Sequence, residues 1–201
     1  MINIFVKLNL NKISLIYKYT SLIFSALFLI FNIINYFTGN TNIQVSTIII
    51  GLLITTTLVP LFFLFLLYIG WKTETLRLKK LFKTKPLDKL ENFGFKTTLI
   101  DDDNKTVPTL QTKGIIINDF KILIGLISND SKRISFKTFI EKTEISEEQY
   151  NKLQENKISF YETTISKIFD IKDIESMDEK QLLNALHEYI SIIKMEKIIP
   201  A

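Results

Sequence analysis

The stretch that decides the fold runs from Tyr19 to Trp71 and reads YTSLIFSALFLIFNIINYFTGNTNIQVSTIIIGLLITTTLVPLFFLFLLYIGW. It contains no Asp, Glu, Lys, Arg or His. A bilayer core about 30 Å thick is crossed by about 20 apolar helical residues. The stretch therefore accommodates two crossings and a short connection. We expect a transmembrane helical hairpin with spans at 19–37 and 45–71.

Basic residues flank this hairpin on both sides. Residues 1–18 contain lysines and no acidic residue, residues 72–86 are strongly basic, and the connection at 38–44 carries no charge. Cytoplasmic flanks of membrane helices are enriched in Lys and Arg. We therefore expect an inner (cytoplasmic) membrane protein with both termini in the cytosol. Residues 1–18 would form a basic interfacial segment, and 72–86 a basic juxtamembrane helix that ends before Pro86.

Each predicted span carries a stripe of small or polar side chains. The stripe of the first span contains Ser21, Ser25, Asn32 and Asn35, and that of the second contains Thr47, Gly51 and Thr55. Small residues four apart let two helices approach closely, and amides avoid lipid. We interpret the stripes as the packing faces within the hairpin. The alternative is that one of them mediates homo-oligomerisation or lines a water-filled path.

Two further features lie in and after the second span. Pro60 cannot donate a hydrogen bond to the carbonyl of Thr56, so we expect a kink there. Five cations then follow the span: Lys72, Arg77, Lys79, Lys80 and Lys83. Their simplest interpretation is a topology-setting flank with snorkelling lysines, and the alternative is a site for an anionic lipid.

The remaining segment, 87–201, predicts a small cytosolic α+β domain. Strand patterns occur at 95–100, 114–127 and 134–141, with a turn at Asn118-Asp119, and they predict an antiparallel meander of three to four strands. A polar turn is expected at 101–104. Capping boxes that begin at Ser146, Ser159 and Ser176 then predict about three helices. The central strand at 120–127 is apolar on both faces, which predicts cover on both sides.

Several chemistries have little support in the composition. The chain of 201 residues has no cysteine, and His187 is its one histidine. This disfavours disulfides, thiolate metal sites and a histidine-dependent catalytic site, and we predict no metal or cofactor. Despite the net charge of +4, the cations cluster beside the predicted membrane, whereas 91–201 contains more acidic than basic residues. We therefore expect no nucleic-acid partner.

These observations favour a non-enzymatic, membrane-anchored interaction module that holds a protein partner at the cytosolic face. An assembly factor, an immunity protein or a regulatory subunit would fit. The alternative is a pore-forming or membrane-perturbing effector with a cytosolic sensor domain, and the third is an enzyme that uses carboxylates. The candidate partner surface is the apolar set Leu123, Ile127, Met195, Ile198 and Ile199. In the competing interpretation, Ile198 and Ile199 fold back onto the sheet.

Overall fold

The computed structural model describes residues 1–39, 44–100, 107–127, 130–141 and 144–201. The chain divides into two compact units. The helical unit comprises Met1–Thr73 and Asp101–Thr109, and the sheet unit comprises Glu74–Ile100 and Leu110–Ala201. The middle of the expected connection, at 40–43, and the expected polar turn at 101–104 lie outside the described residues.

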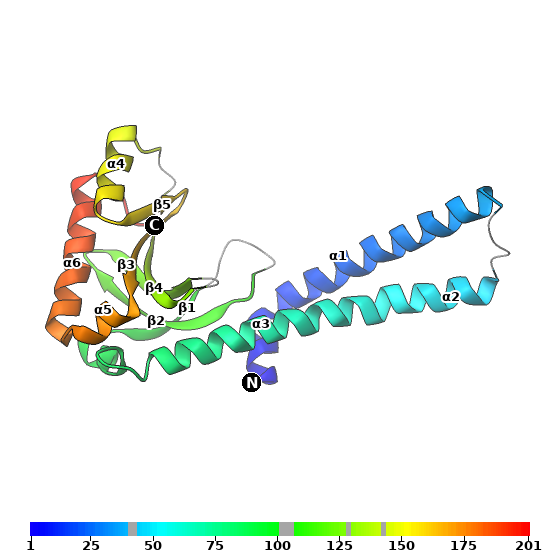
Figure 1. The fold of residues 1–201 in the computed structure, drawn as a ribbon, viewed down its shortest axis with the longest axis horizontal. Helices are drawn as coiled ribbons and strands as arrows, with labels where there is room; N and C mark the ends of the chain where they lie inside the picture. The colour runs from blue at the N-terminus through cyan, green and yellow to red at the C-terminus, as the bar shows by residue number, and fades with distance from the viewer. Residues whose placement is uncertain (40–43, 101–106, 128–129, 142–143) are drawn as a thin grey trace. The chain divides into compact units, whose positions relative to one another are not determined.

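Two long helices lie side by side in the helical unit (Figure 1). The first is α1 (Ile2–Phe37), and the second consists of α2 (Val45–Leu53), a π-helical turn η1 (Ile54–Leu58) and α3 (Val59–Leu81). The helix ends at Phe37 and Val45 agree with the predicted spans. Both helices are long and apolar enough to cross a membrane. In their most apolar windows, 0% and 6% of the residues are buried, whereas a core helix of a soluble protein would be mostly buried.

The sheet unit contains a six-stranded sheet in the order β1-β2-β3-β4-β6-β5. All neighbouring strands are antiparallel. The strands are β1 (Lys96–Ile100), β2 (Leu110–Ile117), β3 (Phe120–Ile127), β4 (Asp130–Phe139), β5 (Ile158–Tyr161) and β6 (Thr164–Asp170). The predicted turn between β2 and β3 is present. Asn118 and Asp119 have φ angles of 50° and 72°, and two positive φ angles are what a tight two-residue hairpin requires.

The prediction of three to four strands was wrong, because the segment after Ser159 forms a hairpin and not a helix. Its Ser-x-x-Glu pattern resembles a capping box, but Glu162 sits in the turn between β5 and β6 with a φ of 43°. β6 pairs with β4 along its whole length, for example Ile165 with Thr138. These ladder hydrogen bonds and the burial of Ile165 outweigh the local helix signal.

The helices of the sheet unit begin at well-defined caps. α4 (Glu147–Glu155) has the predicted capping box, in which Ser146 and Gln149 exchange hydrogen bonds. A short helix, α5 (Ile171–Ser176), comes next. The cap of α6 (Glu179–Met195) is Asp178, paired with Gln181, two residues after the predicted Ser176. A 3₁₀ helix, η2 (Leu87–Phe93), ends at Gly94, which adopts the left-handed conformation that favours glycine.

The core of the sheet unit lies between one face of the sheet and the helices, with α6 crossing that face (Figure 1). Its central members are fully buried: Ile122, Ile124, Ile134, Phe136, Ile165, Leu186, Tyr189, Ile190 and Ile193. The Tyr189 hydroxyl donates a hydrogen bond to the carbonyl of Ile165 at 2.9 Å. A buried phenol therefore keeps a partner while its ring fills the core.

The opposite face of the sheet, here called the second face, is also partly buried. Leu123 on this face of β3 is 1% exposed, in agreement with a central strand covered on both sides. It packs over Gly114 of β2, where an added Cβ would lie 2.7 Å from a Leu123 methyl carbon. The glycine provides the space that the leucine fills.

Candidate functional site

The two predicted packing stripes contact each other within the hairpin. The hydroxyls of Ser25 and Thr55 are 3.2 Å apart, and Thr55 also bonds the carbonyl of Gly51 at 3.0 Å. Gly51 itself lies against the ring of Phe28, because an added Cβ would lie 2.0 Å from the ring's Cζ atom. Hydroxyl groups at this position therefore satisfy one another and the backbone without water.

The other members of the stripes have less specific surroundings. Asn32 donates to the carbonyl of Phe28 in its own helix at 2.7 Å. Ser21 and Asn35 are half-buried, and Thr47 is exposed. The seam of the hairpin is therefore best defined around Ser25, Gly51 and Thr55, and the packing role of the others stays a prediction.

The chain around Pro60 differs from a simple proline kink. A π-helical turn precedes the buried Pro60. The carbonyl of Thr56, which cannot bond to Pro60, accepts a hydrogen bond from the hydroxyl of Tyr17 at 2.9 Å. Tyr17 lies just before the predicted first span, where aromatic residues commonly contact the membrane interface. The structure gives it a further role, because it satisfies a backbone group that proline leaves free.

A second polar arrangement in the helical unit joins three separate segments. Asn9 interrupts α1 with φ −123° and ψ 17°, and its side-chain oxygen accepts from the backbone N–H of Thr109 at 2.7 Å. The indole N–H of Trp71 donates to the carbonyl of Thr109 at 3.0 Å. Both backbone groups of Thr109 are thereby satisfied by side chains.

The ring of Trp71 is buried among aromatic neighbours. Its centroid lies 5.3 Å from that of Phe5 and 6.3 Å from that of Tyr68, and the residue is 3% exposed. Trp71 ends the second predicted span, where aromatic residues commonly contact the lipid headgroups. The indole N–H of Trp71 already has a protein partner, so its hydrogen bond does not depend on the lipid headgroups.

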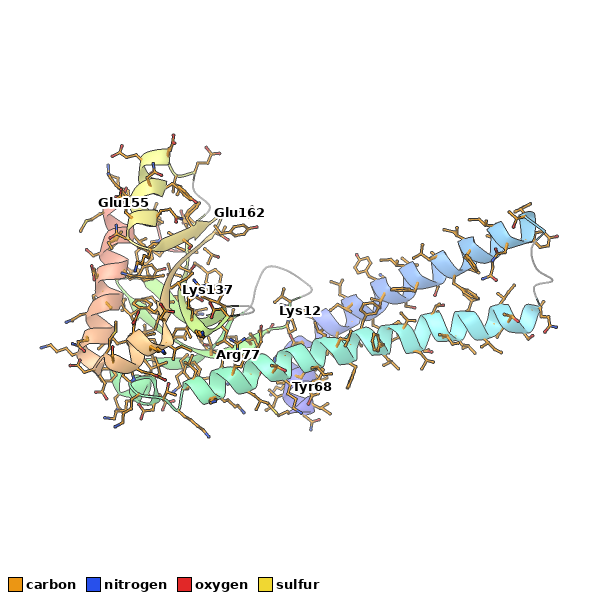
Figure 2. The ribbon with its side chains drawn as sticks, in the orientation of Figure 1. Lys12, Tyr68, Arg77, Lys137, Glu155 and Glu162 are labelled. Carbon is orange, nitrogen blue, oxygen red and sulfur yellow. The ribbon has the colours of Figure 1, made fainter. Side chains whose placement is uncertain are left out.

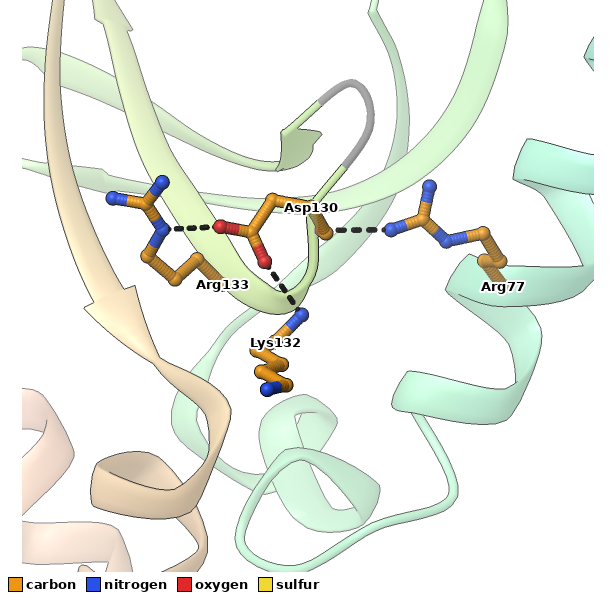
Figure 3. A network of polar contacts seen from close by, with 4 residues as sticks. All are labelled: Arg77, Asp130, Lys132 and Arg133. Carbon is orange, nitrogen blue, oxygen red and sulfur yellow. Dashed lines mark hydrogen bonds and ion pairs between the residues drawn. The ribbon is translucent and has the colours of Figure 1, made fainter.

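The basic segment of α3 contains one cation that is held in place. Arg77 donates from Nη2 to the backbone carbonyl of Asp130 at 2.9 Å (Figure 3). The Asp130 carboxylate accepts from Nε of Arg133 and from the backbone N–H of Lys132 (Figure 3). These bonds, that from Arg133 first, hold the pKa of Asp130 below its usual value. Arg77 therefore fastens the C-terminal part of α3, which from Glu74 on belongs to the sheet unit, to the start of β4.

The other predicted lipid-contacting cations, Lys72, Lys79, Lys80 and Lys83, are exposed. Lys80 lines, together with Arg77, a cavity of about 310 Å³ that also includes Leu126, Ile171 and Glu175. The carboxylate of Glu175 reduces the positive character of this cavity. A lipid-binding role for the five cations stays a prediction, with Arg77 already engaged in the fold.

The predicted partner surface is only partly available. Leu123 and Ile198 are 1% and 4% exposed, so they belong to the interior and the prediction for them was wrong. Ile127 is half-buried. Met195 and Ile199 are 72% and 55% exposed.

The C-terminal tail folds back onto the sheet, as in the competing interpretation. Glu141 donates from its backbone N–H to the carbonyl of Ile199 at 3.1 Å, and Ala201 donates to the carbonyl of Phe139 at 3.3 Å. Ile140 and Pro200 form a bridge between these bonds. The tail thus extends the pairing of β4 and places Ile198 in the core.

An open cavity of about 860 Å³ lies at the same end of the sheet unit, between α4 and the β5–β6 hairpin. Its lining includes Tyr150, Phe160, Glu144, Glu147 and Glu162. Among the described residues, none of the three carboxylates has an ion-pair partner. Sequence reasoning missed this site because its residues come from α4 and from a hairpin that was predicted as a helix.

Comparison with protein-family models, with curated proteins and with solved structures yields no match to this chain.

Proposed function

We propose that the protein is a non-enzymatic, membrane-anchored interaction module with its hairpin in the inner membrane and both termini in the cytosol. The observation that carries this proposal is the exposure of the two long apolar helices. Side chains such as Leu22, Phe31 and Leu58 are 63%, 62% and 60% exposed, and two neighbouring helices of this kind present a continuous apolar surface. Contact between such a surface and lipid costs no free energy. Exposure of the same surface to water is unfavourable.

The contacts inside the hairpin favour an anchor over a pore. Ser25 and Thr55 face each other, and Asn32 bonds its own backbone. A water-filled path would need polar groups directed toward water, and these groups are already paired within one hairpin. Lysines flank both helices on the terminal side, and none is present between Phe37 and Val45. This asymmetry supports cytosolic termini.

Cysteine accessibility tests the proposed topology, because the chain contains no cysteine of its own. A cysteine at Gln44, in the connection, should react with a membrane-impermeant maleimide added to intact cells. A cysteine at Ala201 should react only after the cells are permeabilised. The reverse pattern would refute the orientation. Release of the protein from membranes by carbonate at high pH would refute the anchor itself.

We place the partner contact at the end of the sheet unit that carries the 860 Å³ cavity. Gln149 of α4 bonds the carbonyl of Glu196 at 2.8 Å, so the end of α6 lies beside the cavity. The exposed Met195 therefore belongs to the same region. The aromatic walls, and carboxylates that have no ion-pair partner among the described residues, fit a protein segment that is both basic and apolar. Such a segment would complement the negative charge and bury Tyr150.

Charge reversal on the cavity rim tests this placement. A photo-reactive amino acid would replace Tyr161, which is 75% exposed. Cells would carry this substitution in either the wild-type protein or the E144K/E162K variant, and both would be irradiated to form cross-links. We expect a specific adduct that the variant loses. The matched control is E155K, because Glu155 lies at the far end of α4 from the cavity and Figure 2 shows it apart from Glu162. An adduct of equal strength in all three proteins would contradict the proposed site.

A further inference from the structure

A second cavity, of about 560 Å³, opens over strands β1, β2 and β3 of the sheet unit. Its lining contains Lys96, Lys121, Thr98 and the backbone of Gly114, together with the apolar side chains of Phe93 and Ile116. Among the described residues, no carboxylate belongs to this lining. This is unexpected in a segment where acidic residues outnumber basic ones over 91–201. The lining therefore combines a positive rim with an apolar wall.

The strand register brings a third lysine to the same face. Lys96 lies opposite Gly114, Gly114 opposite Leu123, and Leu123 opposite Lys137. Lys121 precedes Leu123 by two residues on β3, so it also points to the second face. Among the described residues, none of the three ammonium groups has a hydrogen-bond or ion-pair partner. Figure 2 shows Lys137 on the sheet.

Lys137 lies beside a buried hydroxyl, that of Ser135, which is 2% exposed. Its Oγ atom has no hydrogen-bond partner within the part of the chain that the structure describes. A Cβ added to Gly125 would lie 2.9 Å from this Oγ and 3.2 Å from Cε of Lys137, so both atoms border the same point above Gly125. A buried hydroxyl without a partner is costly in a folded protein, and a ligand that accepts a hydrogen bond removes that cost.

We infer that the second face binds a phosphate-bearing ligand with an apolar part. Lys96, Lys121 and Lys137 contact the phosphate oxygens, and Ile116, which is 69% exposed, contacts the apolar part. On binding, the flexible side chain of Lys137 moves from Gly125 to the phosphate and exposes the hydroxyl of Ser135 as a further donor. The phosphate belongs either to a membrane lipid or to a soluble molecule. This inference does not depend on the partner contact proposed above, which uses the other cavity.

Lysine acetylation of the full chain in lipid nanodiscs tests the inference. Three samples would be compared: zwitterionic lipid alone, zwitterionic lipid with phosphatidylglycerol, and zwitterionic lipid with soluble pyrophosphate. We expect acetylation of Lys96, Lys121 and Lys137 to slow at least fivefold in the second or third sample, with Lys157 unchanged as an internal control. Protection in the second sample alone identifies a lipid, and protection in the third identifies a soluble ligand. Equal rates in all samples, or equal protection of Lys157, would overturn the inference.

Substitutions give an independent readout. K96A/K121A changes two exposed side chains, so its melting temperature should equal that of the K157A control while its affinity for the protecting probe falls at least tenfold. S135A removes the unpaired hydroxyl and should raise the melting temperature without ligand while lowering the affinity. An unchanged affinity in K96A/K121A would overturn the inference. If an acidic peptide protects the lysines and both phosphate probes fail, the ligand is a protein and the inference is wrong.

Discussion

The contact between Gly51 and Phe28 gives the sharpest test of the hairpin. In G51A the added methyl carbon would lie 2.0 Å from Cζ and 2.5 Å from Cε2 of the Phe28 ring. Real Cβ contacts essentially never fall below about 3 Å, so the ring must rotate or the helices must separate. Overpacking of this kind costs about 1–3 kcal/mol.

Gly70 supplies a matched control, because an added Cβ there meets no atom within 4 Å. Both glycines lie inside helices, where alanine is favoured over glycine by about 0.5–1 kcal/mol. This helix-propensity gain is common to G51A and G70A and cancels in their comparison. We therefore expect the unfolding free energy of G51A to be lower than that of G70A by about 1–3 kcal/mol, which is the overpacking cost alone.

The assay is a titration of the micelle-bound protein with SDS, followed by far-ultraviolet circular dichroism. F28A in the G51A background should recover part of the loss, because it removes the ring that the new methyl group contacts. A double-mutant cycle measures that recovery. Equal unfolding free energies for G51A and G70A, or a cycle with no coupling, would refute the packing of Gly51 on Phe28.

Three further predictions follow from other contacts. S25C/T55C should form an intramolecular disulfide on mild oxidation, because the native hydroxyls are 3.2 Å apart, and a gel without a reduction-sensitive mobility shift would contradict this. Burial raises the pKa of Tyr189, so folding favours its neutral form; the unfolding free energy should fall as the pH rises above about 10, the usual tyrosine pKa. Y189F should weaken this pH dependence of the unfolding free energy. An identical pH profile in wild type and Y189F would contradict the assignment of the effect to Tyr189. Truncation after Lys194 should lower the melting temperature, because it removes the buried Ile198, and an unchanged melt would show that the tail is dispensable.

Local signals in the sequence were sufficient for several elements. The ends of the predicted spans at Phe37 and Val45, the turn at Asn118-Asp119 and the capping box of Ser146 all agree with the structure. Each depends on residues within a few positions of one another. The same kind of signal failed at Ser159, where a capping pattern was overridden by pairing between β6 and β4.

The candidate sites were less predictable than the elements. The carboxylates of the 860 Å³ cavity come from segments on either side of β5, and the lysines of the second face come from three different strands. No spacing in the sequence marks such a set, because the register between strands decides which side chains meet. The apolar character of Leu123 and Ile198 was visible in the sequence, but the sequence left open whether the fold itself or a partner covers them.

The sequence alone determined that the chain contains a charge-free apolar stretch long enough for two helices, because hydrophobicity and charge are properties of each residue. Tertiary structure decided how the polar groups in and around that stretch are satisfied. Thr109 receives its partners from Asn9, 100 positions away, and from Trp71, 38 positions away. Hydrogen bonds are directional and reach only about 3 Å, so contacts of this kind exist only once the chain has folded.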